Sequence, residues 1–159
     1  MQKNLLKVIL CIGLFSIPFA FKRENLKDWL LIFFLKGYIS SFLNQVVVRS
    51  KAVSYPIRFM PKYFKLNILF DYLLFPLLCV LYNRTSVKSK PFSIILQPMI
   101  YSIPITIIEF VLEKYTKLIE YKKNWNWVIT YSTLVITFLF SRVFISITRK
   151  LHIDKKERS

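Results

Sequence analysis

The sequence predicts an all-α integral membrane protein, a helical bundle of about five transmembrane helices. Hydrophobic residues make up 55% of the 159 residues. They fall in five apolar blocks, each close to the roughly 20 residues that a helix needs to cross the hydrocarbon core. Short charged stretches separate the blocks, as expected where Lys and Arg meet lipid headgroups. Because backbone polar groups in lipid must be paired within the chain, such blocks are expected to be helices.

The five blocks form one predicted transmembrane domain over residues 1–159. The expected spans cover residues 5–21, 29–48, 66–82, 92–112 and 127–147. The first block is interrupted by Lys7 and has the length of a signal-peptide core, so a cleaved signal would leave four spans. An uncleaved helix is favoured, because cleavage after Ala20 would put bulky Pro18 where a small residue is required. In the third block, Pro76 lies mid-span and predicts a kink.

The connections and the tail carry the basic residues. Residues 49–65 form the longest connection, and its two prolines exclude one continuous helix. Alternating basic and aromatic side chains suit a segment that lies on the membrane interface, and the candidate contacts to anionic headgroups are Arg58, Lys62, Tyr63 and Lys65. Trp29, at the start of the second span, is expected at the same kind of interface. Residues 148–159 form a polar basic tail that is expected to be frayed.

Charge and cysteine content argue against several other classes of protein. The net charge is +16, but the basic residues cluster at the ends of apolar blocks, so the expected partner is the lipid bilayer and not nucleic acid. The two cysteines, Cys11 and Cys79, lie inside apolar blocks, and the single histidine, His152, lies in the tail. This pattern has no metal-ligand spacing, and it predicts neither a metal nor a cofactor.

Four ionisable residues inside the spans form the candidate intramembrane polar site: Lys36, Asp71, Glu109 and Arg142. Ionisable groups in lipid are costly and usually face a bundle interior or water. Counting along alternating spans puts Lys36 and Arg142 in one half of the bilayer and the two acids in the other. The cations are expected to extend to the interface, Glu109 to lie near it, and Asp71 to hydrogen bond between helices. The alternative is that Asp71 and Glu109 form a small acidic site for a proton or a cation.

The orientation follows from the positive-inside rule only through these cations. Counted together with the N-terminus and the tail, the connections hold equal numbers of Lys and Arg on the two sides. Lys36 and Arg142, extended toward one side, favour an N-terminus outside and a cytoplasmic C-terminus.

Four stretches carry a resemblance to a known group of proteins. These are residues 22–29 (KRENLKDW), 55–65 (YPIRFMPKYFK), 70–76 (FDYLLFP) and 120–127 (EYKKNWNW). They resemble an uncharacterised family of small multi-pass membrane proteins of bacilli and related spore-forming bacteria. The resemblance implies a location in the bacterial cell membrane. It implies no reaction and no catalytic residue.

Three functions remain open at this point. The favoured hypothesis is a non-catalytic membrane protein that acts through a membrane protein partner or a homo-oligomer, in an envelope, stress or sporulation process. The alternative is a small transporter or channel subunit that uses Asp71 and Glu109. The third is a lipid-modifying enzyme with Glu109 and Glu113 at the interface, although the sequence shows no paired acid and base and no metal motif. The chain is therefore not predicted to be an enzyme.

Overall fold

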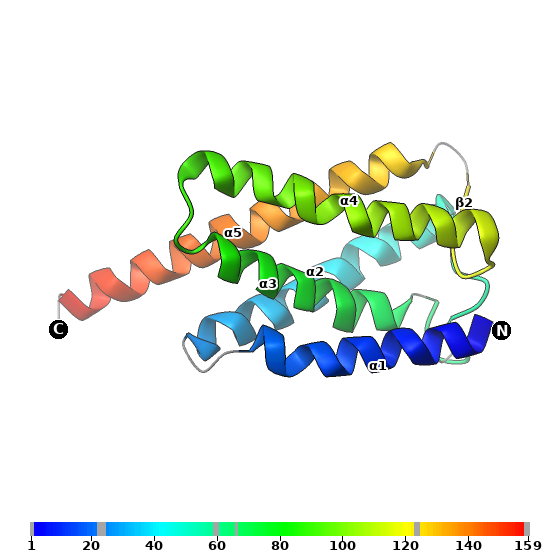
Figure 1. Ribbon diagram of the computed structural model, residues 1–159, viewed down its shortest axis with the longest axis horizontal. Coiled ribbons are helices and arrows are strands. Elements are labelled where there is room, and N and C mark those ends of the chain that lie inside the picture. The colour runs from blue at the N-terminus through cyan, green and yellow to red at the C-terminus, as the bar shows by residue number, and fades with distance from the viewer. Residues whose placement is uncertain (1, 22–24, 59–60, 66, 123–124, 158–159) are drawn as a thin grey trace.

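The protein is a bundle of five helices that alternate in direction (Figure 1). The computed structural model describes residues 2–21, 25–58, 61–65, 67–122 and 125–157, with side chains only between residues 4 and 151. Its elements are α1 (Gln2–Ala20), α2 (Leu26–Arg49), β1 (Val53–Ser54), the π-helix η1 (Phe70–Leu74), α3 (Phe75–Ser86), α4 (Pro91–Tyr115), β2 (Glu120–Tyr121) and α5 (Trp127–Glu157). The N-terminus and β2 lie at one end of the bundle, here called the N-terminal end, and the C-terminus lies at the other.

Each predicted span falls on one helix, although the spans differ in length. Among the described residues, three helices are long and apolar enough to cross a membrane: Leu26–Arg49, Pro91–Tyr115 and Trp127–Leu151. The helix Asn4–Ala20 is apolar but shorter. Leu66, at the start of the predicted third span, and residues 158–159 of the tail lie outside the described residues.

The expectation of a frayed tail is wrong for residues 148–157, which continue α5 as a regular helix to Glu157. The physical reason lies in the sequence after Trp127. It contains neither Gly nor Pro, the two residues that most strongly end a helix. The last helix therefore extends beyond the bundle (Figure 1).

The third helix begins as a π-helix, at the place where the sequence predicts a kink. Residues 70–74 form η1, and the N–H of Phe75 donates to the carbonyl of Phe70. Pro76 follows immediately, and its ring conflicts with the ordinary α-helical position of the carbonyl four residues earlier. A wider π turn before the proline relieves that conflict. It also changes the direction of Asp71, which lies inside η1 and is buried.

A second proline is accommodated by a hydrogen bond between helices. Pro98 in α4 has no N–H, so the Ile94 carbonyl lacks its usual helical donor. The Tyr82 hydroxyl of α3 donates to that carbonyl at 2.9 Å. A neighbouring helix thus satisfies the backbone group that the proline leaves free, as is typical of helices in lipid.

The interior of the bundle holds polar side chains beside an apolar core, and its outer surface is largely apolar. Buried polar side chains come from helices α2 to α5 and η1; they include Lys36, Ser40, Ser41, Asp71, Asn83, Ser86, Ser102, Thr106, Thr130 and Ser141. Large apolar side chains point outward from α1, α2, α4 and α5; among the most exposed are Phe15, Phe19, Phe34, Tyr38, Phe42, Phe92, Ile108 and Ile136. A water-soluble monomer rarely exposes apolar surface on this scale, so the outer surface is compatible with a protein of the membrane.

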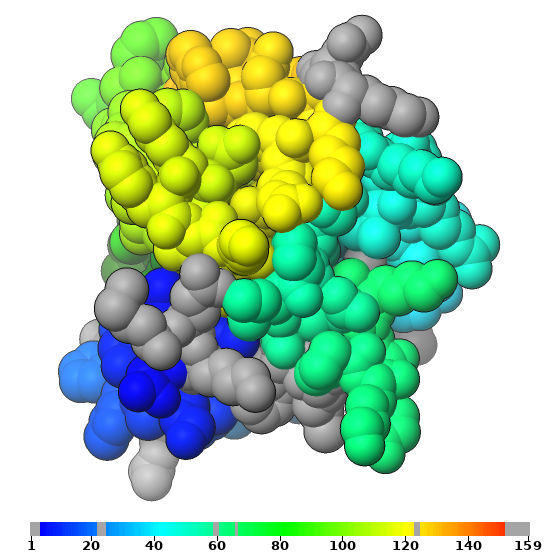
Figure 2. Space-filling model, turned by 90° about the vertical axis from the view of Figure 1, so that its right-hand side faces the viewer, coloured from blue at the N-terminus to red at the C-terminus, as the bar shows by residue number. Residues whose placement is uncertain are grey.

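A short antiparallel ribbon links the two connections at the N-terminal end. Val53 pairs with Tyr121 and Ser54 pairs with Glu120. Figure 2 looks onto this end, where the blue-green connection after α2 lies against the yellow segment after α4. Beneath the ribbon, an apolar cluster buries Leu6, Val53, Tyr55, Leu69, Leu118 and Ile119. The connection at residues 49–65, expected only as an interfacial loop, is thus tied to a second connection in its described part.

The opposite end is held by an ion pair between α2 and α5. Arg149 Nε lies 2.7 Å from Asp28 Oδ2, and the Arg149 guanidinium lies over the ring of Trp29 at 5.5 Å. Trp29 is only 3% exposed. α5 therefore covers Trp29, whose side chain is not exposed at the surface of the bundle, and its position relative to a lipid interface stays a prediction.

The ribbon leads to a prediction about cross-linking. In a variant with Cys11→Ala and Cys79→Ala, the pair Ser54→Cys and Glu120→Cys should form a disulfide on mild oxidation, because the two positions are register partners. Gel mobility with and without reductant measures it. The control pair, Ser54→Cys with Lys88→Cys, spans the two ends of the bundle and should stay reduced. Equal cross-linking of both pairs would contradict the ribbon.

Candidate functional site

The site begins at Asp71, in the π-helix that precedes Pro76. Asp71 is 4% exposed. Its Oδ2 accepts a hydrogen bond of 2.6 Å from Asn44 Nδ2 on α2. The hydroxyl of Tyr55, in the connection after β1, donates to Asn44 Oδ1 at 3.3 Å. Asn44 therefore uses its donor for the carboxyl and its acceptor for the phenol, which fixes the orientation of all three side chains.

Glu109 is the second carboxyl of the site and lies near the end of α4. It is hydrogen bonded to the Tyr121 hydroxyl of β2. That hydroxyl also lies 3.1 Å from Thr130 Oγ1, which accepts from Trp125 Nε1 at 3.0 Å. Glu109 is therefore held by the end of the bundle that carries the ribbon.

Tyr55 connects the two carboxyls electrostatically. Both Asp71 and Glu109 act on its hydroxyl, and they also act on one another. Burial, together with these carboxyls, raises the pKa of Tyr55 well above its usual value. Burial and the Glu109 carboxyl raise the pKa of Tyr121 in the same way. Both phenols therefore stay protonated and remain hydrogen-bond donors at any physiological pH.

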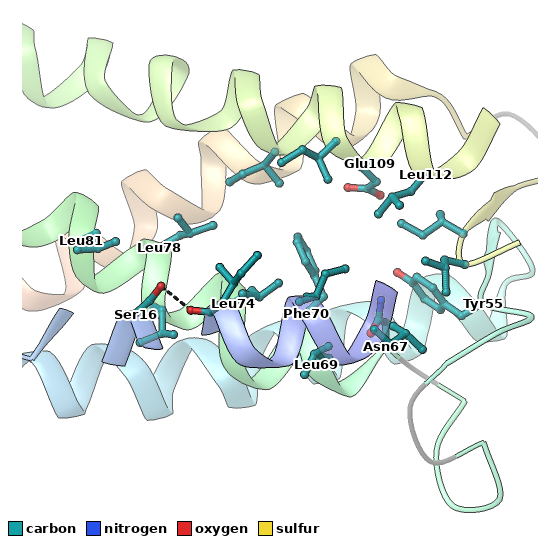
Figure 3. Close-up of a pocket in the computed structure, with 18 residues that line it drawn as sticks. Ser16, Tyr55, Asn67, Leu69, Phe70, Leu74, Leu78, Leu81, Glu109 and Leu112 are labelled. Carbon is teal, nitrogen blue, oxygen red and sulfur yellow. Dashed lines mark hydrogen bonds between the residues drawn. The ribbon is translucent and has the colours of Figure 1, made fainter. Parts of the chain in front are cut away.

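A cavity of about 290 Å³ adjoins this cluster (Figure 3). Its lining comes from α1, the connection after α2, the third helix, α4 and the connection after α4. Most of the lining is aliphatic, and its polar members are Ser16, Tyr55, Asn67 and Glu109. Figure 3 places Tyr55, Asn67 and Glu109 at one end and Leu78, Leu81 and Ser16 at the other. The cavity therefore has a polar end at the acidic cluster and an apolar end deeper in the bundle.

Lys36 is buried in the bundle, so the expectation that it extends to the interface is wrong. It is 3% exposed, and its Nζ lies 3.7 Å from the centre of the Phe75 ring. Asp71 and Cys79 are its electrostatic neighbours. Among the described residues, Lys36 has no carboxylate oxygen within 4.0 Å. The aromatic ring stabilises the ammonium where the long side chain is enclosed on the inner face of α2.

Arg142 lies apart from the acidic site. Its Nη2 donates to the carbonyl of Ser86 at 3.3 Å, at the C-terminal end of α3. A cation there is favoured by the partial negative charge of a helix C-terminus. Of the four predicted intramembrane residues, Asp71, Glu109 and Lys36 thus lie around one region, and Arg142 belongs to the other end of the bundle.

The candidate headgroup contacts divide into two kinds. Arg58 is only partly exposed, and its guanidinium donates to the carbonyls of Tyr55, Pro61 and Phe64. It shapes the connection that holds Tyr55. Lys62, Tyr63 and Lys65 are exposed at the N-terminal end and remain candidates for lipid contact.

Four residues of the site were not singled out by the sequence: Asn44, Tyr55 as a hydrogen-bonding group, Asn67 and Tyr121. Asn44 is an amide inside an apolar span, which is itself a signal of an interhelical hydrogen bond. Tyr55 and Tyr121 lie in connections, where aromatic residues are common at an interface. Their role depends on the ribbon. Its strands are too short to produce a recognisable pattern in the sequence.

Metal binding has no support in the described part of the chain, where no three His, Cys, Asp or Glu side chains come together. Comparison with known protein families, curated proteins and solved structures found no match to the chain. The resemblance to small membrane proteins of bacilli thus stays a prediction.

The Asp71–Asn44 hydrogen bond predicts a specific pattern of stability. Asn44→Leu leaves a buried carboxyl without its donor and should lower the free energy of unfolding by about 1–3 kcal/mol. Replacing both partners, with Asn44→Leu and Asp71→Leu, should restore part of that loss, because the carboxyl is removed together with its donor and only the Tyr55 hydroxyl loses a partner. Denaturant unfolding in detergent measures both.

The control is Gln45→Leu, which changes an exposed neighbour on the same helix. It should change stability by no more than about 0.5 kcal/mol. An Asn44→Leu variant as stable as Gln45→Leu would contradict the hydrogen bond.

Proposed function

We propose that the chain is a multi-pass membrane protein whose five helices all cross the bilayer, and that it is a small transporter or channel subunit. In this proposal Asp71 and Glu109 bind a proton or a small cation. The observation that supports it is the grouping of two carboxyls around Tyr55, beside a cavity, in a bundle with an apolar outer surface. Ionisable groups are costly inside a membrane protein and usually mark an ion or substrate path.

The arrangement suits reversible binding of a positive charge. The carboxyls lie close enough to act on one another, so occupancy of one changes the affinity of the other. Asn44 and Tyr121 donate hydrogen bonds to them and would hold their positions with or without a bound cation. Because the sequence has no internal repeat, a transport path is expected to need a second copy or a partner subunit.

The proposed topology places the N-terminus outside and the C-terminus in the cytoplasm of a bacterial cell. The resemblance to membrane proteins of bacilli supports the cell membrane as the location. Arg142, near the C-terminal end of the bundle, favours a cytoplasmic position for that end. Lys36 is buried, so it gives no information on the orientation of the chain.

Five crossings predict which connections share a side of the membrane. In the variant without native cysteines, Lys62→Cys and Lys117→Cys should react with a membrane-impermeant maleimide added to intact cells. Lys88→Cys should react only after permeabilisation. If Lys88→Cys and Lys62→Cys reacted alike in intact cells, the third helix would not cross. The reverse pattern would overturn only the orientation.

Transport predicts ion movement that depends on Asp71. Purified protein in liposomes should dissipate a pH or sodium gradient faster than protein-free liposomes, followed with an enclosed fluorescent indicator. Asp71→Asn and Glu109→Gln remove the charges that bind the cation, so each should reduce the flux to the leak of empty liposomes. Glu113→Gln, one turn further along α4 and outside the cavity lining, is the matched control and should retain the flux.

A flux that is unaltered by Asp71→Asn would exclude this role for the acidic site. The favoured alternative is then a non-catalytic protein that acts through a membrane partner. The projecting end of α5, with exposed Lys150 and Leu151, is the feature that supports it. A second protein that co-purifies in stoichiometric amount, combined with the absence of flux, would support that alternative.

A further inference from the structure

The cavity opens through the side of the bundle. Ile12 of α1 and Ile108 of α4 both line it, and they are 57% and 59% exposed. α1 packs on α3, whereas α4 packs on α3 and α5. The opening between α1 and α4 therefore faces the same surroundings as the apolar outer surface. In a membrane, a molecule dissolved in the bilayer could enter there without crossing water.

The polar end of the cavity presents a hydrogen-bond acceptor. Glu109 contributes a carboxyl to the described lining. An ionised carboxyl beside an apolar cavity is stabilised by a cationic donor. The Tyr55 hydroxyl is already used, because it donates to Asn44.

The remaining lining accommodates an alkyl chain. From the polar end, aliphatic side chains of the third helix, including Leu74, Leu78 and Leu81, extend toward the apolar end (Figure 3). No Lys or Arg belongs to the described lining, so a phosphate or carboxylate head would face Glu109 without a counter-charge. An ammonium head would instead pair with the Glu109 carboxyl.

We propose that the cavity binds a single-chain alkyl amine, with its ammonium group on the Glu109 carboxyl and its chain along the third helix. The proposal rests on the membrane location in the proposed function, but it does not depend on transport. Under the proposed topology the polar end lies toward the N-terminal face, which also holds the connection at residues 49–65. An amine anchored in that leaflet would therefore enter with its head at the depth of Glu109.

The test uses dodecylamine that carries a photoreactive diazirine near the end of its chain. The full chain is placed in phosphatidylcholine nanodiscs, irradiated with the probe, and digested for mass spectrometry. Labelling is expected at the apolar end of the cavity, on the peptide that contains Leu78 and Leu81. Excess dodecylamine should abolish it, and dodecanoate, which has the same chain length and an anionic head, should not.

Two variants locate the binding. Glu109→Gln removes the charge-assisted contact and should weaken binding roughly tenfold to a hundredfold, whereas Glu113→Gln should leave binding unchanged. Leu78→Trp fills the chain site and should also abolish labelling. Displacement by dodecanoate as effective as by dodecylamine would overturn the proposal, because the cavity would then accept any chain. The competition uses unmodified protein, so it is decisive even if Glu109→Gln does not fold.

The outcomes separate this proposal from the proposed function. Amine binding without ion flux would reject the transport role and leave the ligand site in place. Ion flux without specific labelling would reject the ligand site and leave the acidic site in place.

Discussion

The third helix is the element on which the arrangement of the others depends. α3 contacts α1, α2, α4 and α5. Its surroundings are therefore protein on most sides, and Leu77, Cys79, Val80 and Tyr82 are almost fully buried. A helix enclosed in this way need not match the thickness of a bilayer, and it can carry polar groups at little cost. The third helix is surrounded by other helices, so the direction in which Asp71 points decides which of them its carboxyl contacts. The π-helix sets that direction.

A surrounding of lipid, as proposed above, would account for the polar side chains that join the helices. Burial of apolar surface drives helix association only weakly when lipid chains already surround the helices, so packing and hydrogen bonds between helices carry more of the specificity. Two contacts of α3 illustrate this. Tyr82 donates to the carbonyl of Ile94 that Pro98 leaves free, and Asn83 donates to Ser141 of α5 at 2.8 Å. Gly13 adds close packing, because a Cβ at that position would lie 2.6 Å from a Leu73 methyl carbon.

The lengths of the apolar blocks predicted the helices well. Each apolar segment must satisfy its own backbone hydrogen bonds, so its helical structure does not depend on the other segments. The site was predicted only in part. Asp71 and Glu109 were identified because charge inside an apolar block is costly, whatever the neighbours. Lys36 was misplaced because counting depth along a span ignores which face of the helix a residue occupies. Asn44 carries a signal in the sequence, as an amide inside an apolar span, whereas the role of Tyr55 depends on the ribbon, which joins two connections that are far apart in sequence.

The ribbon, the acidic cluster and the polar end of the cavity form one continuous structure at the N-terminal end. Tyr121 belongs to β2 and bonds Glu109, while Tyr55 follows β1 and reaches Asn44 beside Asp71. A positive charge placed at Glu109 would therefore change the field at Tyr55 and at Asp71. By thermodynamic linkage, a cation held at Asp71 would alter the affinity of the cavity by the same factor. Occupancy of the cavity and occupancy of Asp71 would then be a single coupled equilibrium, whose strength is set by how rigidly the ribbon holds the two tyrosines.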